Sequence, residues 1–249
     1  MVQYTTEAIV LRLRKYREAD ALVTLFTKER GKVTGVAKGI YKPTSSLRGG
    51  VQPYSTNQMQ LISGRSTLYT IAQSECLEML LPLRQSIEAM TLGAYWAELL
   101  ENFGQEEMAD DGLYLLAKAG FLGLAIHASP VMACALEIRL IEQQGLRPDF
   151  ASCCRCGVHL PDEKYRRFSS SEGGFLCEAC GAYVQDVIRV NPAIPGIWQG
   201  LEKMALDKVD RVSITGYQLE ETQKLLRQWI MRQTGKPMKT WQMMKKMEV

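Results

Sequence analysis

The chain has 249 residues, of which 46% are apolar and 23% are charged, a globular composition that excludes a disordered or fibrous protein. Its formal charge of +3 is spread unevenly. Residues 1–80 hold 11 Lys and Arg against 6 Asp and Glu, and residues 191–249 hold 10 against 6, whereas residues 81–150 hold 4 against 10. The basic front indicates a polyanionic partner.

The first 80 residues alternate apolar and polar side chains with the period of half-exposed strands. The last two of the expected strands flank the turn signal Ser63-Gly64-Arg65 and predict a hairpin. So many short strands in one segment indicate a small barrel, with the OB-fold as the leading candidate and an SH3-like barrel as the alternative. The five strands are expected at residues 9–13, 22–27, 33–39, 58–62 and 67–73.

Helical spacing of apolar residues replaces this alternation from residue 80 onward. Gly145 is a candidate C-cap, and Thr215 with Gln218 matches a capping box. The helical segments before and after residues 151–190 are each too short to bury much core alone. We therefore expect one helical domain that is interrupted by residues 151–190, a segment we call the excursion. Helices are predicted over residues 83–100, 113–127, 131–144, 194–206 and 215–235.

The longest uncharged stretch, residues 119–136, lies inside this helical region. A membrane span needs about 20 apolar residues, and Ser129-Pro130 gives a helix-start signal within the stretch. The N-terminal residues show no charged region followed by an apolar run, so no secretory signal is expected. We therefore expect two helices here, a cytoplasmic location and no membrane contact.

The excursion carries two Cys-x-x-Cys-Gly motifs. Two residues between cysteines let both sulfurs reach one ion, and four thiolates close a tetrahedral site of the structural type. The glycines that follow, Gly157 and Gly181, are expected to take a positive φ that turns backbone N–H groups toward sulfur. The predicted ligands of one structural Zn²⁺ are Cys153, Cys156, Cys177 and Cys180.

Alternatives to this ligand set exist. Two disulfides or free thiols are disfavoured by a cytoplasmic compartment and by the regular spacing. Cys154 competes with Cys153, but the spacing from Cys154 to Cys156 is the poorer chelate, and His159 is the remaining possible ligand. Between the motifs, residues 165–168 and 175–176 predict a small hairpin around residues 172–174.

The basic front gathers its charges at the end of the first strand and in the Gly-rich stretch 35–50. A flexible backbone, point charges and a stacking ring suit a single-stranded nucleic acid, whereas the alternative is a solvated face with a mobile loop. The candidate DNA contacts are Arg12, Arg14, Lys15, Arg17, Lys38, Tyr41, Lys42 and Arg48.

Other features predict packing or solvent exposure. Phosphate-loop, dinucleotide and zincin motifs are missing from the sequence, and the acidic cluster at residues 106–111 is interpreted as a solvated loop. Cys76, Cys134 and His127 are expected in the core. The same is expected of Trp96, Trp198 and Trp229.

A series of short motifs occurs in a specific order along the chain. These motifs are Tyr16-Arg-Glu-Ala-Asp20, Thr24-Leu-Phe-Thr27, Gly35-Val-Ala-Lys-Gly39, Leu47-Arg48, Gln52-Pro-Tyr-Ser55, Gly145-Leu-Arg-Pro148, Cys153-x-x-Cys156-Gly and Gly173-Gly-x-Leu-Cys177-x-x-Cys180. Through these motifs the sequence as a whole resembles the RecO family of bacterial recombination mediators. The doubled Cys153-Cys154 and the Met-rich end, residues 241–249, depart from the family pattern.

This resemblance implies an α+β multidomain protein. The expected parts are an N-terminal OB-fold nucleic-acid-binding domain (1–80), an α-helical domain (81–150 and 191–249) and an inserted zinc-ribbon-like module (151–190). It further implies a DNA repair protein of the RecF pathway, without an enzyme's catalytic centre, that binds single- and double-stranded DNA and anneals strands. The implied partners are RecR, the C-terminal tail of single-strand-binding protein and, indirectly, RecA, at the nucleoid.

Two other classes of function remain open. A zinc-ribbon interaction scaffold would use the barrel to bind protein without direct DNA contact. A metal-dependent hydrolase is disfavoured because the sequence offers only two His residues and a closed four-cysteine set.

Overall fold

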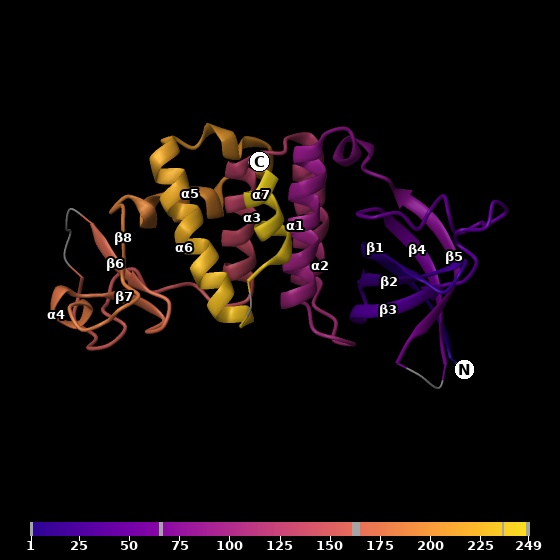
Figure 1. Cartoon of the computed structure of the whole chain (residues 1–249), viewed down its shortest axis with the longest axis horizontal. Coiled ribbons are helices and arrows are strands. Elements are labelled where there is room, and N and C mark those ends of the chain that lie inside the picture. Colours follow the sequence, from indigo (N-terminus) through magenta and orange to yellow (C-terminus); the bar gives the residue numbers. More distant parts are fainter. Residues whose placement is uncertain (1, 65–66, 161–164, 236, 248–249) are drawn as a thin grey trace. The chain divides into compact units, whose positions relative to one another are not determined.

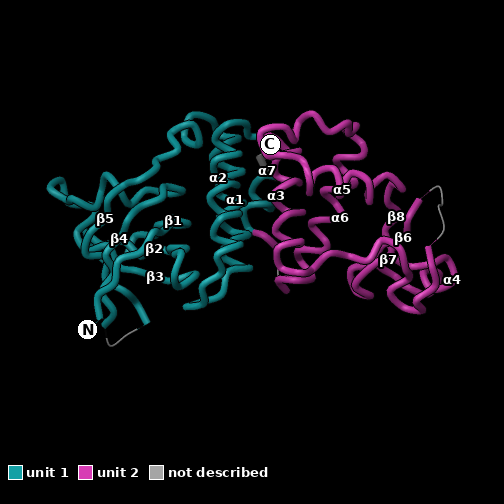
Figure 2. The backbone as a smooth tube through the Cα atoms, turned by 180° about the vertical axis from the view of Figure 1, so that it is seen from behind, with its two compact units in different colours: residues 1–128, 239–249 teal, residues 129–238 magenta. Residues whose placement is uncertain are grey.

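The computed structural model describes residues 2–64, 67–160, 165–235 and 237–247 (Figure 1). The chain forms two compact units, residues 1–128 with 239–249 and residues 129–238 (Figure 2). Among the described residues, no helix combines the length and the apolarity that crossing a bilayer would require.

The first unit begins with a closed barrel in the strand order β1-β2-β3-β5-β4. β1 pairs with both β2 and β4 in antiparallel fashion, and the barrel closes through a parallel pairing of β3 with β5. This confirms the predicted OB-fold. Arg65 of the expected turn lies outside the described residues. The strands are β1 (Gln3–Tyr16), β2 (Asp20–Thr27), β3 (Gly31–Ala37), β4 (Thr56–Ser63) and β5 (Tyr69–Glu78).

Alternation along the strands fills the barrel with apolar side chains. Val10, Val23, Leu25 and Met59 are among the residues that are fully buried there. The inward positions follow a period of two along most of the strands. The outward positions are not all polar, because Phe26 is apolar and buried outside this core.

The loop after β3, residues 38–55, is anchored to the barrel, unlike the flexible backbone of the DNA-binding interpretation and the mobile loop of its alternative. Ile40, Leu47 and Val51 all insert into the barrel core, with at most 6% of each residue exposed. Burying three apolar side chains anchors the loop, so its exposed residues are held in place.

Aromatic side chains of α2 pack on one side of the barrel. Tyr114 of α2 stacks on Phe26, and Phe121 of α2 stacks on Tyr54. The elements are η1 (Leu81–Arg84), α1 (Ile87–Phe103), α2 (Asp111–Ile126) and α7 (Lys239–Met247).

The C-terminal helix α7 is not marked by a pattern in the sequence. Its first two backbone N–H groups, on Lys239 and Thr240, each donate to the carboxylate of Glu98 on α1 at 2.8 Å. Glu98 therefore satisfies orphan donors at the start of a helix that lies more than 130 residues away along the chain.

The acidic segment between α1 and α2, residues 106–111, forms ion pairs with the barrel and is also exposed to solvent. Lys32 and Glu106 form an ion pair at 3.4 Å, and Arg30 and Glu107 form one at 3.3 Å. Asp110 caps α2 by accepting a hydrogen bond from Leu113 N at 2.8 Å. These carboxylates thus fix the connection instead of forming an isolated loop.

The second unit combines helices with a small sheet in the order β7-β6-β8. Ser129 caps α3 and Thr215 forms the capping box of α6, both as predicted. The predicted hairpin is β6 with β7, whereas β8 was not predicted. The elements are α3 (Pro130–Gln143), β6 (Arg166–Ser169), β7 (Gly174–Leu176), α4 (Glu178–Gly181), β8 (Ile188–Val190), α5 (Ile194–Lys203), η2 (Leu206–Arg211) and α6 (Gly216–Thr234).

Two of the core expectations are wrong. Cys76 is exposed because the last residues of β5 lie outside the barrel interior. His127 is exposed because α2 ends at Ile126 and the chain turns there. Cys134 is fully buried, as predicted. The three tryptophans Trp96, Trp198 and Trp229 are likewise at most 5% exposed.

Candidate metal centre and nucleic-acid interface

The four predicted cysteine ligands meet at one point of the second unit. The Sγ atoms of Cys153, Cys156, Cys177 and Cys180 all lie within 4.8 Å of one another. Tetrahedral bonds of about 2.3 Å to zinc would place the sulfurs roughly 3.8 Å apart. The Sγ atoms of Cys156 and Cys177 are 3.8 Å apart, so the donor set fits a tetrahedral ion.

Local backbone geometry builds each half of this cluster. In the first half, Gly157 takes a φ of +74° and its N–H donates to the Cys153 carbonyl at 2.8 Å. In the second half, Cys177 is the N-cap of α4, and its sulfur accepts from Cys180 N at 3.5 Å. Gly181 does not take the positive φ that we expected, because it lies inside α4.

Electrostatics favour a cation at the cluster. Burial alone would raise the pKa of Cys153, but hydrogen bonds from the backbone N–H groups of Cys177, Cys156 and Arg155 lower it to about 6. The pKa of Cys180 is raised to about 12, first by its hydrogen bond with the Cys177 side chain. Cys153 thus ionises readily, whereas Cys180 resists ionisation. A divalent cation bound at the cluster would favour the thiolate form of both residues.

The two alternative ligands lie outside the cluster. Cys154 is exposed, and its Cβ lies against Gly174 on β7. His159 is exposed, and its backbone forms a bridge with Ser152. The structure therefore brings Cys153 to the other three sulfurs, in agreement with the spacing argument.

Hydrogen bonds place the first residues of the loop after β3 beside the turn between β1 and β2. Tyr41 N donates to Ala19 O at 3.1 Å, and Gly39 N donates to Asp20 Oδ1 at 2.8 Å. These bonds tie the anchored loop to the turn between β1 and β2. Lys38, Tyr41 and Lys42 consequently lie beside that turn. We call the eight predicted contacts the basic barrel surface: Arg12, Arg14, Lys15, Arg17, Lys38, Tyr41, Lys42 and Arg48.

All eight members of this surface are exposed. Tyr41 is 47% exposed, and Arg17 places its guanidinium 5.2 Å from the ring centroid of Tyr16. Arg48 is exposed in the same loop, and its carbonyl accepts from Gln52 Nε2 at 2.6 Å. The lysines and arginines among them thus present their charge to solvent.

Arg12 differs from the rest. Its guanidinium lies 2.6 Å from a carboxylate oxygen of Glu101 on α1. Burial raises the pKa of Glu101, and the positive charge of Arg12 opposes that rise. Arg12 therefore already compensates a half-buried carboxylate, which leaves less of its charge available to a phosphate.

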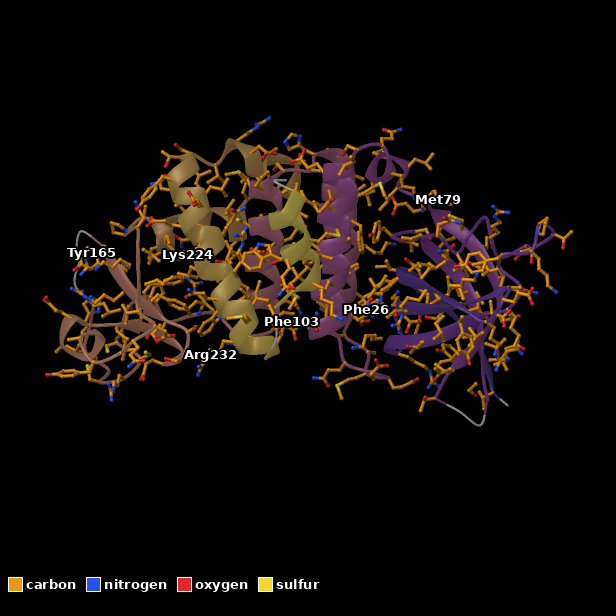
Figure 3. The ribbon with its side chains drawn as sticks, in the orientation of Figure 1. Phe26, Met79, Phe103, Tyr165, Lys224 and Arg232 are labelled. Atoms are coloured by element: carbon orange, nitrogen blue, oxygen red, sulfur yellow. The ribbon has the colours of Figure 1, made fainter. Side chains whose placement is uncertain are left out.

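The inserted module also holds a group that the sequence analysis did not single out. Tyr165, labelled in Figure 3, lies within cation–π distance of both Arg167 and Arg189. The direct pairing of the two arginines across β6 and β8 brings them together. The signal was not visible in the sequence because β8 was not predicted.

Comparisons with known proteins cover nearly the whole chain. Residues 1–80 match the family model described as "Recombination protein O N terminal", and residues 84–242 match "Recombination protein O C terminal". The DNA repair protein RecO of Alkaliphilus metalliredigens is 34% identical over 91% of this chain and 92% of its own.

Two further relatives carry the same description. The DNA repair protein RecO of Desulforamulus reducens is 30% identical over 97% of this chain and 93% of its own. That of Symbiobacterium thermophilum is 28% identical over 96% of both chains.

Proposed function

The chain belongs to the RecO family of DNA repair proteins and has a recombination-mediator role in DNA repair, and we propose that it performs this role by binding DNA on the basic barrel surface. The proposal covers single- and double-stranded DNA. It extends to annealing of complementary strands and, with RecR, to loading of RecA on DNA coated with single-strand-binding protein.

The observation that carries this proposal is the anchoring of the loop after β3. Three buried side chains, Ile40, Leu47 and Val51, hold the loop. Two of its backbone N–H groups also donate hydrogen bonds, one to the Ala19 carbonyl and one to the Asp20 carboxylate. Cations held in place lose less conformational entropy when they meet a phosphate than cations on a free loop. The exposed ring of Tyr41 adds a platform on which a base can stack.

Contacts of this kind predict binding without base specificity. Lys38, Lys42 and Arg48 are point charges that attract phosphates, and phosphate contacts carry no sequence information. The positive charge of this surface also explains the proposed annealing activity. A surface that binds two DNA strands lowers the repulsion between their phosphates while the bases pair.

We further propose one structural Zn²⁺ held by Cys153, Cys156, Cys177 and Cys180. Four thiolates leave no open coordination position, so the ion would stabilise the module at residues 151–190 and take no part in bond making. Residues 81–150 with 191–249 would form the helical domain around it. The C-terminal tail of single-strand-binding protein is a further proposed partner, without assigned residues, in a cytoplasmic protein at the nucleoid.

Fluorescence titration of single-stranded DNA with the full chain tests the proposal. Lys42→Ala should weaken binding for every base sequence, and Tyr41→Ala should cost roughly 1–3 kcal/mol with little change in salt dependence. The matched control is Lys28→Ala, which removes an exposed lysine from the β2–β3 turn at the other end of β2. If Lys42→Ala and Lys28→Ala both bind like the wild type, the barrel is instead a protein-contact module of a scaffold.

A further inference from the structure

Two arginines of the inserted module lie next to each other on paired strands of its small sheet. Arg167 on β6 and Arg189 on β8 are direct antiparallel partners. Like charges at such positions destabilise a sheet. Both guanidinium groups lie on the ring of Tyr165, with Cζ 4.8 Å from the ring centroid for Arg167 and 4.5 Å for Arg189.

In the part of the chain that the structure describes, Glu178 is a carboxylate next to this pair. Glu178 lies 3.7 Å from Arg167, and its side chain is 84% exposed, whereas that of Arg167 is 11% exposed. Arg167 also donates to the Tyr165 hydroxyl at 3.2 Å. The charged side chains among the residues that line the neighbouring cavity are these two arginines and the exposed Glu178, so the charges of this lining sum to a positive value.

The same side chains line a cavity of about 310 Å³. Its remaining wall is formed by Gly181, Ala182 and Val187, between α4 and β8. This volume is near the lower limit of small-ligand pockets, roughly 300 Å³, and accommodates a phosphate with part of its sugar. A guanidinium is the side chain best suited to phosphate, because its planar donors match two phosphate oxygens.

We propose that this cavity binds a backbone phosphate of a DNA strand, with Arg189 and Arg167 as donors and Tyr165 as the residue that positions both guanidinium groups. The bound anion would remove the repulsion between the paired arginines. The assignment of the phosphate to DNA rests on the proposed function. It adds a second DNA contact, in the second unit, to the basic barrel surface.

The test uses the full chain and single-stranded DNA, with affinity measured at several salt concentrations. Arg189→Gln should lower the magnitude of the salt slope by about 0.7 and weaken binding about fivefold at 0.1 M salt, the effect of one lost phosphate contact on a single strand. Arg189→Lys should retain most of the affinity. Glu178→Gln should act in the opposite direction and tighten binding, because it removes the opposing carboxylate.

Arg211→Gln is the matched control, since it removes an exposed arginine from η2 of the same unit. Zinc content and melting temperature establish that each variant is folded. Should Arg189→Gln not fold, the exposed Glu178→Gln decides alone. Two results would overturn the inference, provided that Lys42→Ala loses affinity for DNA. The first is that Arg189→Gln binds DNA like Arg211→Gln, and the second is that Glu178→Gln does not tighten binding. If Lys42→Ala is unchanged but Arg189→Gln weakens binding, the barrel proposal fails and this one stands.

A site for free phosphate would give a different pattern. Inorganic phosphate, with ionic strength matched by chloride, would then raise the melting temperature of the wild type but not of Arg189→Gln, while both bind DNA equally. That result would overturn the assignment to DNA.

Discussion

Asp186 holds together the turn between β6 and β7, and replacing it tests how the inserted module is stabilised. Its carboxylate accepts from Ser169 Oγ at 2.6 Å and from Ser170 Oγ at 3.1 Å. It also accepts from Ser171 through the hydroxyl at 2.7 Å and the backbone N–H at 2.9 Å. Arg232 of α6 donates to the Ser171 carbonyl at 2.6 Å, which ties the same turn to a helix (Figure 3).

The expected cost follows from which donors water can reach. Ser171 is exposed, so after Asp186→Ala its groups bind water at little cost. Ser169 is fully buried and loses an acceptor, a cost of about 1–3 kcal/mol, and loss of the charge-assisted bonds adds to it. We expect Asp186→Ala to lower the free energy of unfolding by about 2–4 kcal/mol, measured by urea denaturation at pH 7. Ser171→Ala is the matched control and should cost less than about 1 kcal/mol.

The effect should also depend on pH in a definite direction. Burial opposes the shift, but hydrogen bonds from Ser169 and Ser171 hold the pKa of Asp186 well below its usual range. A group whose folded-state pKa is depressed stabilises above its unfolded pKa, near 3.9, and loses that contribution as pH falls. The stability difference between wild type and Asp186→Ala should therefore be constant from pH 7 to about 5 and shrink below 4. A difference that is under 0.5 kcal/mol at pH 7, or that grows on acidification, would refute the reasoning.

Three other substitutions test the metal centre and the barrel. Cys177→Ser should abolish stoichiometric zinc in elemental analysis and destabilise the module. Cys154→Ser is the matched control and should keep full zinc content. Loss of zinc in Cys154→Ser alone would show that Cys154 is the ligand. Gly31→Ala should lower stability by more than about 2 kcal/mol, because φ is +60° and a Cβ would lie 1.9 Å from the Met108 carbonyl oxygen. A wild-type melting temperature for Gly31→Ala would contradict the packing of residues 104–108 on β3.

The barrel could be predicted from sequence because most of its strand residues alternate between inside and outside, although the register of β1 shifts between Val10 and Arg12. The loop after β3 could not, since Ile40, Leu47 and Val51 follow no strand or helix period that marks them as core. Their burial depends on the barrel mouth that the other strands create. Cys76 was misplaced for a related reason, because nothing local shows where β5 leaves the barrel.

The four-cysteine cluster was predictable residue by residue because its spacing is local. The choice of Cys153 over Cys154 followed from two-residue chelate geometry, and the sulfur cluster agrees with it. The pairing of Arg167 with Arg189 was not predictable. It depends on β8, a strand of three residues that is too short to show a recognisable pattern in the sequence. Likewise, α7 depends on Glu98, a contact between distant parts of the chain.

Binding of DNA by the basic barrel surface is tested most directly by the salt dependence of single-stranded DNA affinity for the triple variant Lys38→Ala, Lys42→Ala, Arg48→Ala. Three lost phosphate contacts should reduce the magnitude of the slope of log K against log salt by about 2, with equal loss for all base sequences. The triple variant should also anneal complementary strands more slowly. A folded triple variant that binds with the affinity and slope of the wild type would contradict the assignment of DNA binding to the barrel.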